Sequence, residues 1–189
     1  MYKRVVFGFL VLTGFASFFV GQGQAQTPAR PPAPATAKGS PAAGSKVPAN
    51  LGQLMKGILY PSSNVIFAAQ DQNPADVPPA KDPSVATNPL ASAYGKWEAV
   101  ENSALALSEA ANLLTLPGRK CANGRDVPIN NADWPKFVQG LRDAGAKVYK
   151  AAQAKSQDAI VDAADTMTTA CSNCHDKYRE KTNLADRCK

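Results

Sequence analysis

Four stretches of this chain repeat their apolar residues with the 3.6-residue period of an α-helix, and this pattern constrains the fold more than any other feature. The expected helices cover about residues 51–70, 89–116 and 157–179, and a further one that begins after Asp133 and carries its apolar stripe to Ala152. No alternating run of β-branched residues competes with them, so the sequence predicts an all-α protein. Because the connections are short to moderate, we expect an antiparallel up-down-up-down four-helix bundle.

Turn and cap residues mark where these helices begin, bend and end. Pro61 lacks a backbone donor and is expected to kink the first helix near Gly57. Asn88-Pro89 has the composition of a cap followed by a first-turn proline, and Asp133 is expected to cap the third helix. Residues 71–88 contain four prolines and are predicted to form a loop.

The first 25 residues have the pattern of an export signal. Lys3 and Arg4 precede a 16-residue apolar run, residues 5–20, and Gly23-Gln24-Ala25 offers small residues at the positions an export peptidase reads. We expect cleavage after Ala25 and export to the periplasm, where disulfides persist. A retained membrane anchor is the alternative, although the run is shorter than the roughly 20 residues that span a bilayer. After cleavage, we expect no membrane span.

Residues 26–48 contain six prolines and are otherwise mostly Ala, Gly, Ser and Thr. Such a segment cannot bury enough apolar surface to offset the entropy lost on ordering. The sequence therefore predicts a disordered tether at 26–48 and one folded domain at 49–189.

The chemistry of the chain is concentrated in the motif Cys171-Ser172-Asn173-Cys174-His175. On a helix, Cys171, Cys174 and His175 share one face. Two thiols at this spacing can add to the vinyl groups of a haem while the imidazole binds its iron, which is the c-type attachment pattern. A redox dithiol is the alternative interpretation. Because His175 is the only histidine, a zinc site with two histidines and a haem held between two histidines are both excluded.

A four-helix chain that ends in a helix with the sequence Cys-Ser-Asn-Cys-His-Asp-Lys-Tyr-Arg resembles the class II cytochromes c, the family of cytochrome c′ and its six-coordinate relatives. The resemblance covers about residues 50–180, and its specific part is Cys171, Cys174, His175, Tyr178 and Arg179. It implies one covalently bound haem c, with His175 as the proximal iron ligand and Arg179 beside it near the haem edge.

The sixth iron position is the main question that the sequence raises. No methionine follows His175, but the expected topology places the start of the first helix level with the end of the fourth. Met55 lies four residues into the first helix and is therefore expected to be the sixth ligand, whereas Met167 shares a helix with His175. If Leu54 or Ile58 faces the iron instead, the distal side is apolar and open.

Two further expectations concern the same end of the bundle. Leu114, Phe137 and Leu141 are predicted to line an apolar haem pocket. Cys121 and Cys188 are expected to form a structural disulfide there, with free thiols as the alternative.

Charge is also concentrated at that end. The chain has a net charge of +6, of which Lys3 and Arg4 account for two. Residues 117–137 carry four basic and two acidic side chains, and residues 175–189 carry five and three, so each contributes +2. This weakly positive rim would steer an acidic redox partner, although a solvated rim is the ordinary alternative. This modest net charge does not indicate nucleic-acid binding.

Two functions of different classes follow. The first is a periplasmic monohaem electron carrier with His175 and Met55 on the iron, without enzymatic activity, acting alone or as one relay in a larger complex. The alternative is a five-coordinate haem protein that binds nitric oxide or carbon monoxide. A peroxidase would need a distal acid-base residue, which a chain with one histidine does not readily supply. A homodimer and a monomer both remain open.

Overall fold

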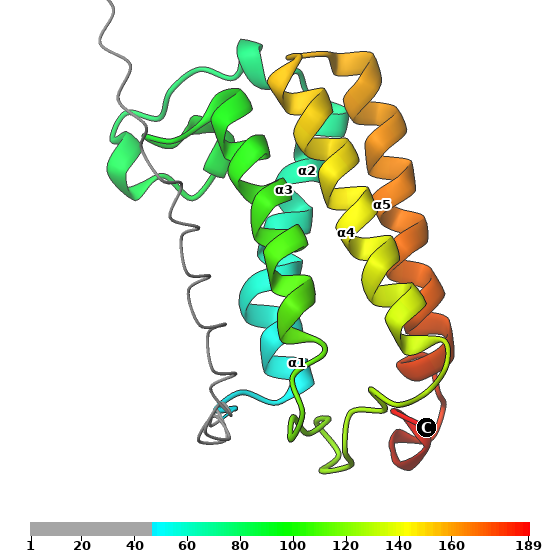
Figure 1. Cartoon of the computed structure of the whole chain (residues 1–189). Helices are drawn as coiled ribbons and strands as arrows, with labels where there is room; N and C mark the ends of the chain where they lie inside the picture. Colours follow the sequence, from blue (N-terminus) through cyan, green and yellow to red (C-terminus); the bar gives the residue numbers. More distant parts are fainter. Residues whose placement is uncertain (1–46) are drawn as a thin grey trace, which may run out of the picture. The chain divides into compact units, whose positions relative to one another are not determined.

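The computed structural model describes residues 47–189, and this part of the chain is mostly helical (Figure 1). Within it the elements are helices joined by turns, and the only β pairing is an isolated bridge between Lys120 and Asp126. The all-α prediction is therefore confirmed. The predicted signal peptide and the predicted tether up to residue 46 lie outside the described residues. No helix between residues 47 and 189 has both the length and the apolar character needed to cross a membrane.

The first long helical run contains a π-helical segment. It consists of α1 (Leu51–Leu54), the π-helical segment η1 (Met55–Leu59) and α2 (Tyr60–Asp71). Asn50 begins the run with a capping box, in which its side chain and that of Gln53 each accept a hydrogen bond from the other's backbone N–H. The run matches the predicted first helix.

The predicted irregularity near Gly57 is present as this π turn. Inside it the N–H of Tyr60 donates to the carbonyl of Met55, five residues earlier instead of four. Pro61 follows at once and cannot donate to the carbonyl of Gly57, as an ordinary α-helix would require. The wider turn relieves the conflict between the proline ring and that carbonyl.

The second long helix, α3 (Lys96–Leu113), begins later than the sequence predicts. The Asn88 side chain does accept a hydrogen bond from the N–H of Leu90, but it caps only the single 3-10 turn η4 (Pro89–Ala91). A tight turn at Gly95 then separates η4 from α3, since a Cβ there would lie 2.4 Å from the carbonyl oxygen of Leu90. The predicted start at Pro89 is therefore wrong. The preceding loop contains two other 3-10 turns, η2 (Pro74–Asp76) and η3 (Pro83–Val85).

The last two long helices, α4 (Trp134–Gln153) and α5 (Gln157–Tyr178), agree with the prediction. Packing joins α3 to α4, α4 to α5, and α2 to both α3 and α5. Gly145 lets α4 approach α3 closely, because a Cβ there would meet the hydroxyl oxygen of Ser108 at 2.2 Å. Val161, in α5, is exposed. The interior of the packed helices is apolar, with Ile66, Leu107, Ile160 and Met167 among its fully buried side chains.

One end of the helices brings distant parts of the chain together (Figure 1). The N–H of Leu51, at the start of α1, donates to the carbonyl of Lys120 at 2.8 Å. The next residue, Cys121, lies at disulfide distance from Cys188, with 2.00 Å between the sulfur atoms. The N–H of Cys188 in turn donates to the carbonyl of Tyr178, at the end of α5. We call this region, formed by the start of α1, loop 114–133, the end of α5 and tail 179–189, the motif end.

Candidate functional site

The three residues of the predicted attachment motif lie together near the end of α5. Cys171 and Cys174 are free thiols, half-buried, and both pack against the edge of the apolar core. His175 is half-buried as well. Because residues three and four positions apart share a helix face, the structure brings the two thiols and the imidazole to one side of α5.

Burial controls the protonation of this group. Desolvation, and after it the charges of Cys171 and Asp133, raises the pKa of the Cys174 thiol to about 11. Desolvation also raises the pKa of Cys171, against an opposing effect of Arg179. A reactive redox dithiol instead requires a thiol whose pKa is lowered. The electrostatics of the pair therefore give no support to the dithiol interpretation.

The surroundings of the His175 imidazole favour its neutral form. Desolvation, followed by the charge of Arg179, lowers the pKa of His175, and the nearby Glu180 and Asp176 oppose this only in part. A neutral imidazole is the form that binds a metal ion. Arg179 itself is exposed and forms an ion pair with Glu180. Its effects on His175 and Cys171 place its charge near the motif.

A polar cluster that the sequence did not indicate lies beside the motif. The hydroxyl of Tyr178 donates to Asp133 at 2.6 Å and accepts from the side-chain amide of Asn131 at 3.1 Å. Lys177 forms an ion pair with the same carboxylate of Asp133. The Asp133 side chain therefore ties the start of α4 to the last turn of α5.

The expectation that Asp133 caps α4 with its side chain is wrong. Asp133 does occupy the position before Trp134, but its backbone is helical (φ −93°, ψ −20°) and its side chain makes no capping hydrogen bond. A capping side chain normally requires an extended backbone at this position. The Tyr178 hydroxyl and Lys177 take up the carboxylate instead.

Aromatic packing supports the same corner. The Tyr178 ring meets Trp134 edge-on at 5.1 Å and Phe137 at 6.1 Å between ring centroids. Trp134 is almost fully buried, and its indole N–H donates to the carbonyl of Leu114 at 3.1 Å. The end of α5 is therefore fixed against both α4 and the end of α3.

The Asp133 cluster gives a pH prediction. Hydrogen bonds from Lys177 and Tyr178 hold the pKa of Asp133 below its ordinary value of 3.8. A carboxyl whose pKa is lowered by folding stabilises the protein above its unfolded-state pKa, and this stabilisation is lost as the pH falls through its folded-state pKa. The melting temperature of Asp133→Asn should therefore lie below that of the unmodified protein at pH 6, and the difference should shrink below pH 4. Asp165→Asn, at an exposed carboxylate of α5, is the control; a constant difference down to pH 2.5 would contradict the prediction.

The other predicted pocket residues vary in exposure. Leu54, Leu114 and Leu141 are buried, Phe137 packs at the edge of the core, and Ile58 is 36% exposed. Two surface hollows lie near the motif, one bounded by Asp133 and Lys177 and the other between α4 and α5. His175 lines neither of them.

Met55 is partly buried and packs against the edge of the core. Its segment η1 has its main contacts with α1, α2 and α3, whereas α5 has its own with α2 and α4. Met55 and His175 therefore lie on different elements, η1 and α5, whose main packing partners differ. Met167 is fully buried on α5 itself.

Two arginines of the motif end were not singled out from the sequence. Arg119 is buried and donates to the carbonyls of Leu113 at 3.0 Å and of Ala49 at 2.5 Å. Arg187 lies in the tail, and its Nε is buried without a hydrogen-bond partner in the described part of the chain. No local pattern identifies either, because their surroundings come from segments far apart in the sequence.

Comparison with protein-family models, with curated proteins and with solved structures finds no match for this chain. Its function must therefore be inferred from its own residues and contacts.

Proposed function

We propose that this chain is an exported c-type cytochrome that transfers electrons through one covalently bound haem. Cys171 and Cys174 would form the two thioether bonds, and His175 would be the proximal iron ligand. The observation that carries the proposal is the placement of two free, half-buried thiols, packed against the edge of the apolar core, on the same face of α5 as the half-buried His175.

The residues present fit a haem. The porphyrin supplies four iron ligands, so the protein needs to add one or two. It is therefore no obstacle that among residues 47–189 no three His, Cys, Asp or Glu side chains form a metal-binding cluster. Of the predicted pocket residues, Phe137 packs at the edge of the core, and Leu114 and Leu141 are buried within it. A bound haem would supply a one-electron iron couple, whose potential the protein adjusts through axial ligand, burial and hydrogen bonding.

The proposal includes the architecture and location expected of such a protein. The packed long helices would be the antiparallel four-helix bundle of the class II cytochromes c. Export would place the mature protein in the periplasm, where attachment of a c-type haem and formation of the Cys121–Cys188 disulfide are compatible with the redox environment. We assign no enzymatic activity.

Met55 is the proposed sixth ligand. It directly follows α1, whose start belongs to the motif end, and is partly accessible, whereas Met167 is fully buried two turns before His175 on the same helix. Histidine and methionine together close the iron to outside ligands and raise the reduction potential, which suits electron transfer. The alternative, a five-coordinate protein that binds nitric oxide or carbon monoxide, is favoured by one observation: the neighbouring Leu54 is more deeply buried than Met55.

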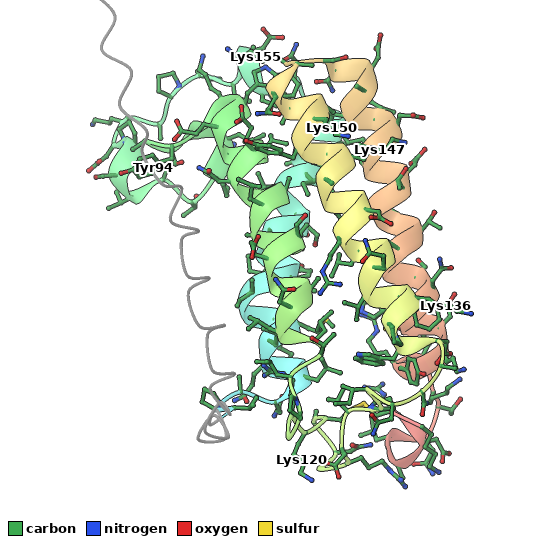
Figure 2. All side chains as sticks on the ribbon, in the orientation of Figure 1. Tyr94, Lys120, Lys136, Lys147, Lys150 and Lys155 are labelled. Atoms are coloured by element: carbon green, nitrogen blue, oxygen red, sulfur yellow. A yellow bond between two sulfur atoms is a disulfide. The ribbon has the colours of Figure 1, made fainter. Side chains whose placement is uncertain are left out.

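An acidic redox partner is the third part of the proposal. Lys120 and Lys136 lie at the motif end, while Lys150 and Lys155 lie toward the other end of the helices (Figure 2). Lys120 is paired with Asp126, and the ion pairs of Lys177, Arg179 and Lys189 also offset part of the positive charge. The remaining charge would mainly affect how fast a partner associates and how strongly salt slows it.

The carbon monoxide response distinguishes the two haem functions. The reduced holoprotein should have a low-spin spectrum that carbon monoxide leaves unchanged, because Met55 occupies the sixth position. Met55→Ala should open that position and give a carbon monoxide complex. Met167→Leu, a volume-conserving change on α5, should keep the unresponsive spectrum. Rapid carbon monoxide binding by the unmodified protein would instead favour the gas-binding alternative.

A further inference from the structure

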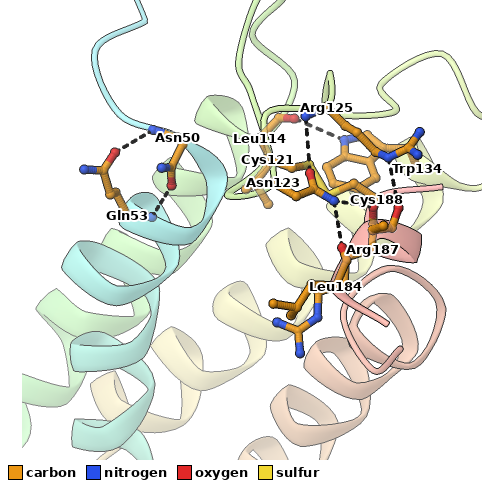
Figure 3. The surroundings of a disulfide bond; sticks show 11 residues. Asn50, Gln53, Leu114, Cys121, Asn123, Arg125, Trp134, Leu184, Arg187 and Cys188 are labelled. Carbon is orange, nitrogen blue, oxygen red and sulfur yellow. Dashed lines mark hydrogen bonds between the residues drawn. A yellow bond between two sulfur atoms is a disulfide. The ribbon is translucent and has the colours of Figure 1, made fainter. Parts of the chain in front are cut away.

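The tail that follows α5 is held at the motif end by side chains of loop 114–133 (Figure 3). The side-chain amide of Asn123 donates to the carbonyl of Leu184 at 2.9 Å and to that of Arg187 at 3.1 Å. Arg125 donates through Nε to the carbonyl of Ala185 at 3.0 Å. These bonds hold the tail through its backbone carbonyls and do not involve the Arg187 side chain.

The Arg187 backbone is fixed on its other side by the next residue. Cys188 lies at disulfide distance from Cys121, and its N–H donates to the carbonyl of Tyr178 at 2.9 Å. Tyr178 is three residues after His175. Arg187 is therefore held beside the last turn of the helix that carries the attachment motif.

One donor of the partly exposed Arg187 side chain is buried without a hydrogen-bond partner in the described part of the chain. The side chain extends from the tail in the direction of the helices (Figure 3), and the donor is its Nε. The two carboxylates nearest in sequence are engaged elsewhere, Glu180 with Arg179 and Asp186 with Lys189. Residues 1–46 contain no Asp or Glu and cannot supply a carboxylate side chain. A buried charged donor without an acceptor destabilises a protein.

We propose that Arg187 is the binding group for a carboxylate at the motif end, and that this carboxylate is a propionate of the bound haem. The inference rests on the proposed function and deepens it. A guanidinium presents a planar fork of donors that matches the two oxygens of a carboxylate. A propionate would supply both the missing acceptor and the opposite charge. The Cys121–Cys188 link then positions Arg187 in addition to stabilising the fold.

The arrangement has a redox consequence. Reduction of the iron lowers the charge of the site by one unit, so a nearby cation favours the reduced form. Removing Arg187 would leave the propionate charge uncompensated and favour the oxidised form. The reduction potential should therefore fall, and a positive side chain restored at this position should recover part of the fall.

The test compares Arg187→Gln with Arg125→Gln in the holoprotein. Both variants lose one guanidinium of the motif end, but Arg125 is exposed and holds the tail only through the Ala185 carbonyl. We expect a lower reduction potential and a lower unfolding midpoint for Arg187→Gln than for Arg125→Gln, with the potential partly recovered in Arg187→Lys. Equal shifts in the two glutamine variants would mean that the effect comes from a loosened tail, and would overturn the inference.

Haem content, measured by mass on each purified protein, distinguishes a failure of the proposed function from a failure of the inference about Arg187. If the unmodified protein carries no haem after expression with an attachment machinery, the proposed function and the inference fail together. If it carries haem and Arg187→Gln does not differ from Arg125→Gln, only the inference fails. If Arg187→Gln does not accumulate, Arg187→Lys is compared with Arg125→Gln instead. Because lysine keeps the charge, the reduction potential should stay close to that of the unmodified protein, while the unfolding midpoint should fall.

Discussion

Replacing Cys171 and Cys174 together with alanine is expected to leave the chain without covalently bound haem. Each thiol forms one of the two proposed thioether bonds, so the double variant loses both. Denaturation followed by acidic organic extraction should remove any haem that remains, and the mass of the variant should equal that of its polypeptide. The unmodified protein should keep one haem through the same treatment.

The chain contains a matched control for this experiment. Cys121→Ala with Cys188→Ala also removes two cysteines from the motif end, but these sulfur atoms lie at disulfide distance from each other and are not the free thiols of the motif. This variant should retain covalent haem. If it loses haem to the same extent as the Cys171 and Cys174 variant, attachment depends on the integrity of the whole end and not on the motif thiols. Haem retained after replacement of both motif cysteines would contradict the proposed function directly.

Loss of the Cys121–Cys188 link is expected to lower the free energy of unfolding by about 4 kcal/mol, because the link restricts the unfolded chain. The two residues are 67 positions apart, so the bond closes a long loop in the denatured protein. Cys121 is also buried in the native protein, so its replacement by alanine removes some packing. Urea unfolding of the unmodified protein and of the Cys121→Ala, Cys188→Ala variant would measure the difference.

A reductant provides the internal control. Reducing the unmodified protein should lower its urea midpoint by a comparable amount, while the same reductant should leave the midpoint of the double variant unchanged. A loss below about 1 kcal/mol in both comparisons would mean that the denatured chain is already restricted in this region, so that the link adds little.

The helices that the sequence predicts well are those whose start and end signals agree with their apolar pattern. The range of α5 follows from one uninterrupted stripe, and α4 begins at a tryptophan followed by proline. The start of α3 differs from the prediction because Asn88-Pro89 is a valid local signal that here begins only a 3-10 turn. What ends that turn is the close approach of Gly95 to the Leu90 carbonyl, which no periodicity reveals.

The candidate site also contains some residues that the sequence predicts and others that it does not. Cys171, Cys174 and His175 could be grouped from the sequence because helix geometry alone places them on one face. The partner of Tyr178 could not, since Asp133 lies 45 residues earlier and its pattern suggested a cap. Arg187 was also missed, because an unpartnered Nε is visible only when the tail, the loop and the helices are placed together.

The π turn between α1 and α2 has a consequence for the phase of the first helix. A π-helical turn holds about one residue more than an α-helical turn, and one residue corresponds to about 100° of rotation around a helix axis. The faces of α1 and α2 therefore do not follow one continuous stripe, although both belong to the same helical run. Leu54 and Leu59 are both buried although they lie five residues apart. Removing a single residue between Met55 and Leu59 would restore the α pattern and leave the start of the helix facing the same way, because the π turn already takes up the extra residue. The π turn therefore shifts the spacing of the buried residues along the sequence without turning the start of the helix away from the interior.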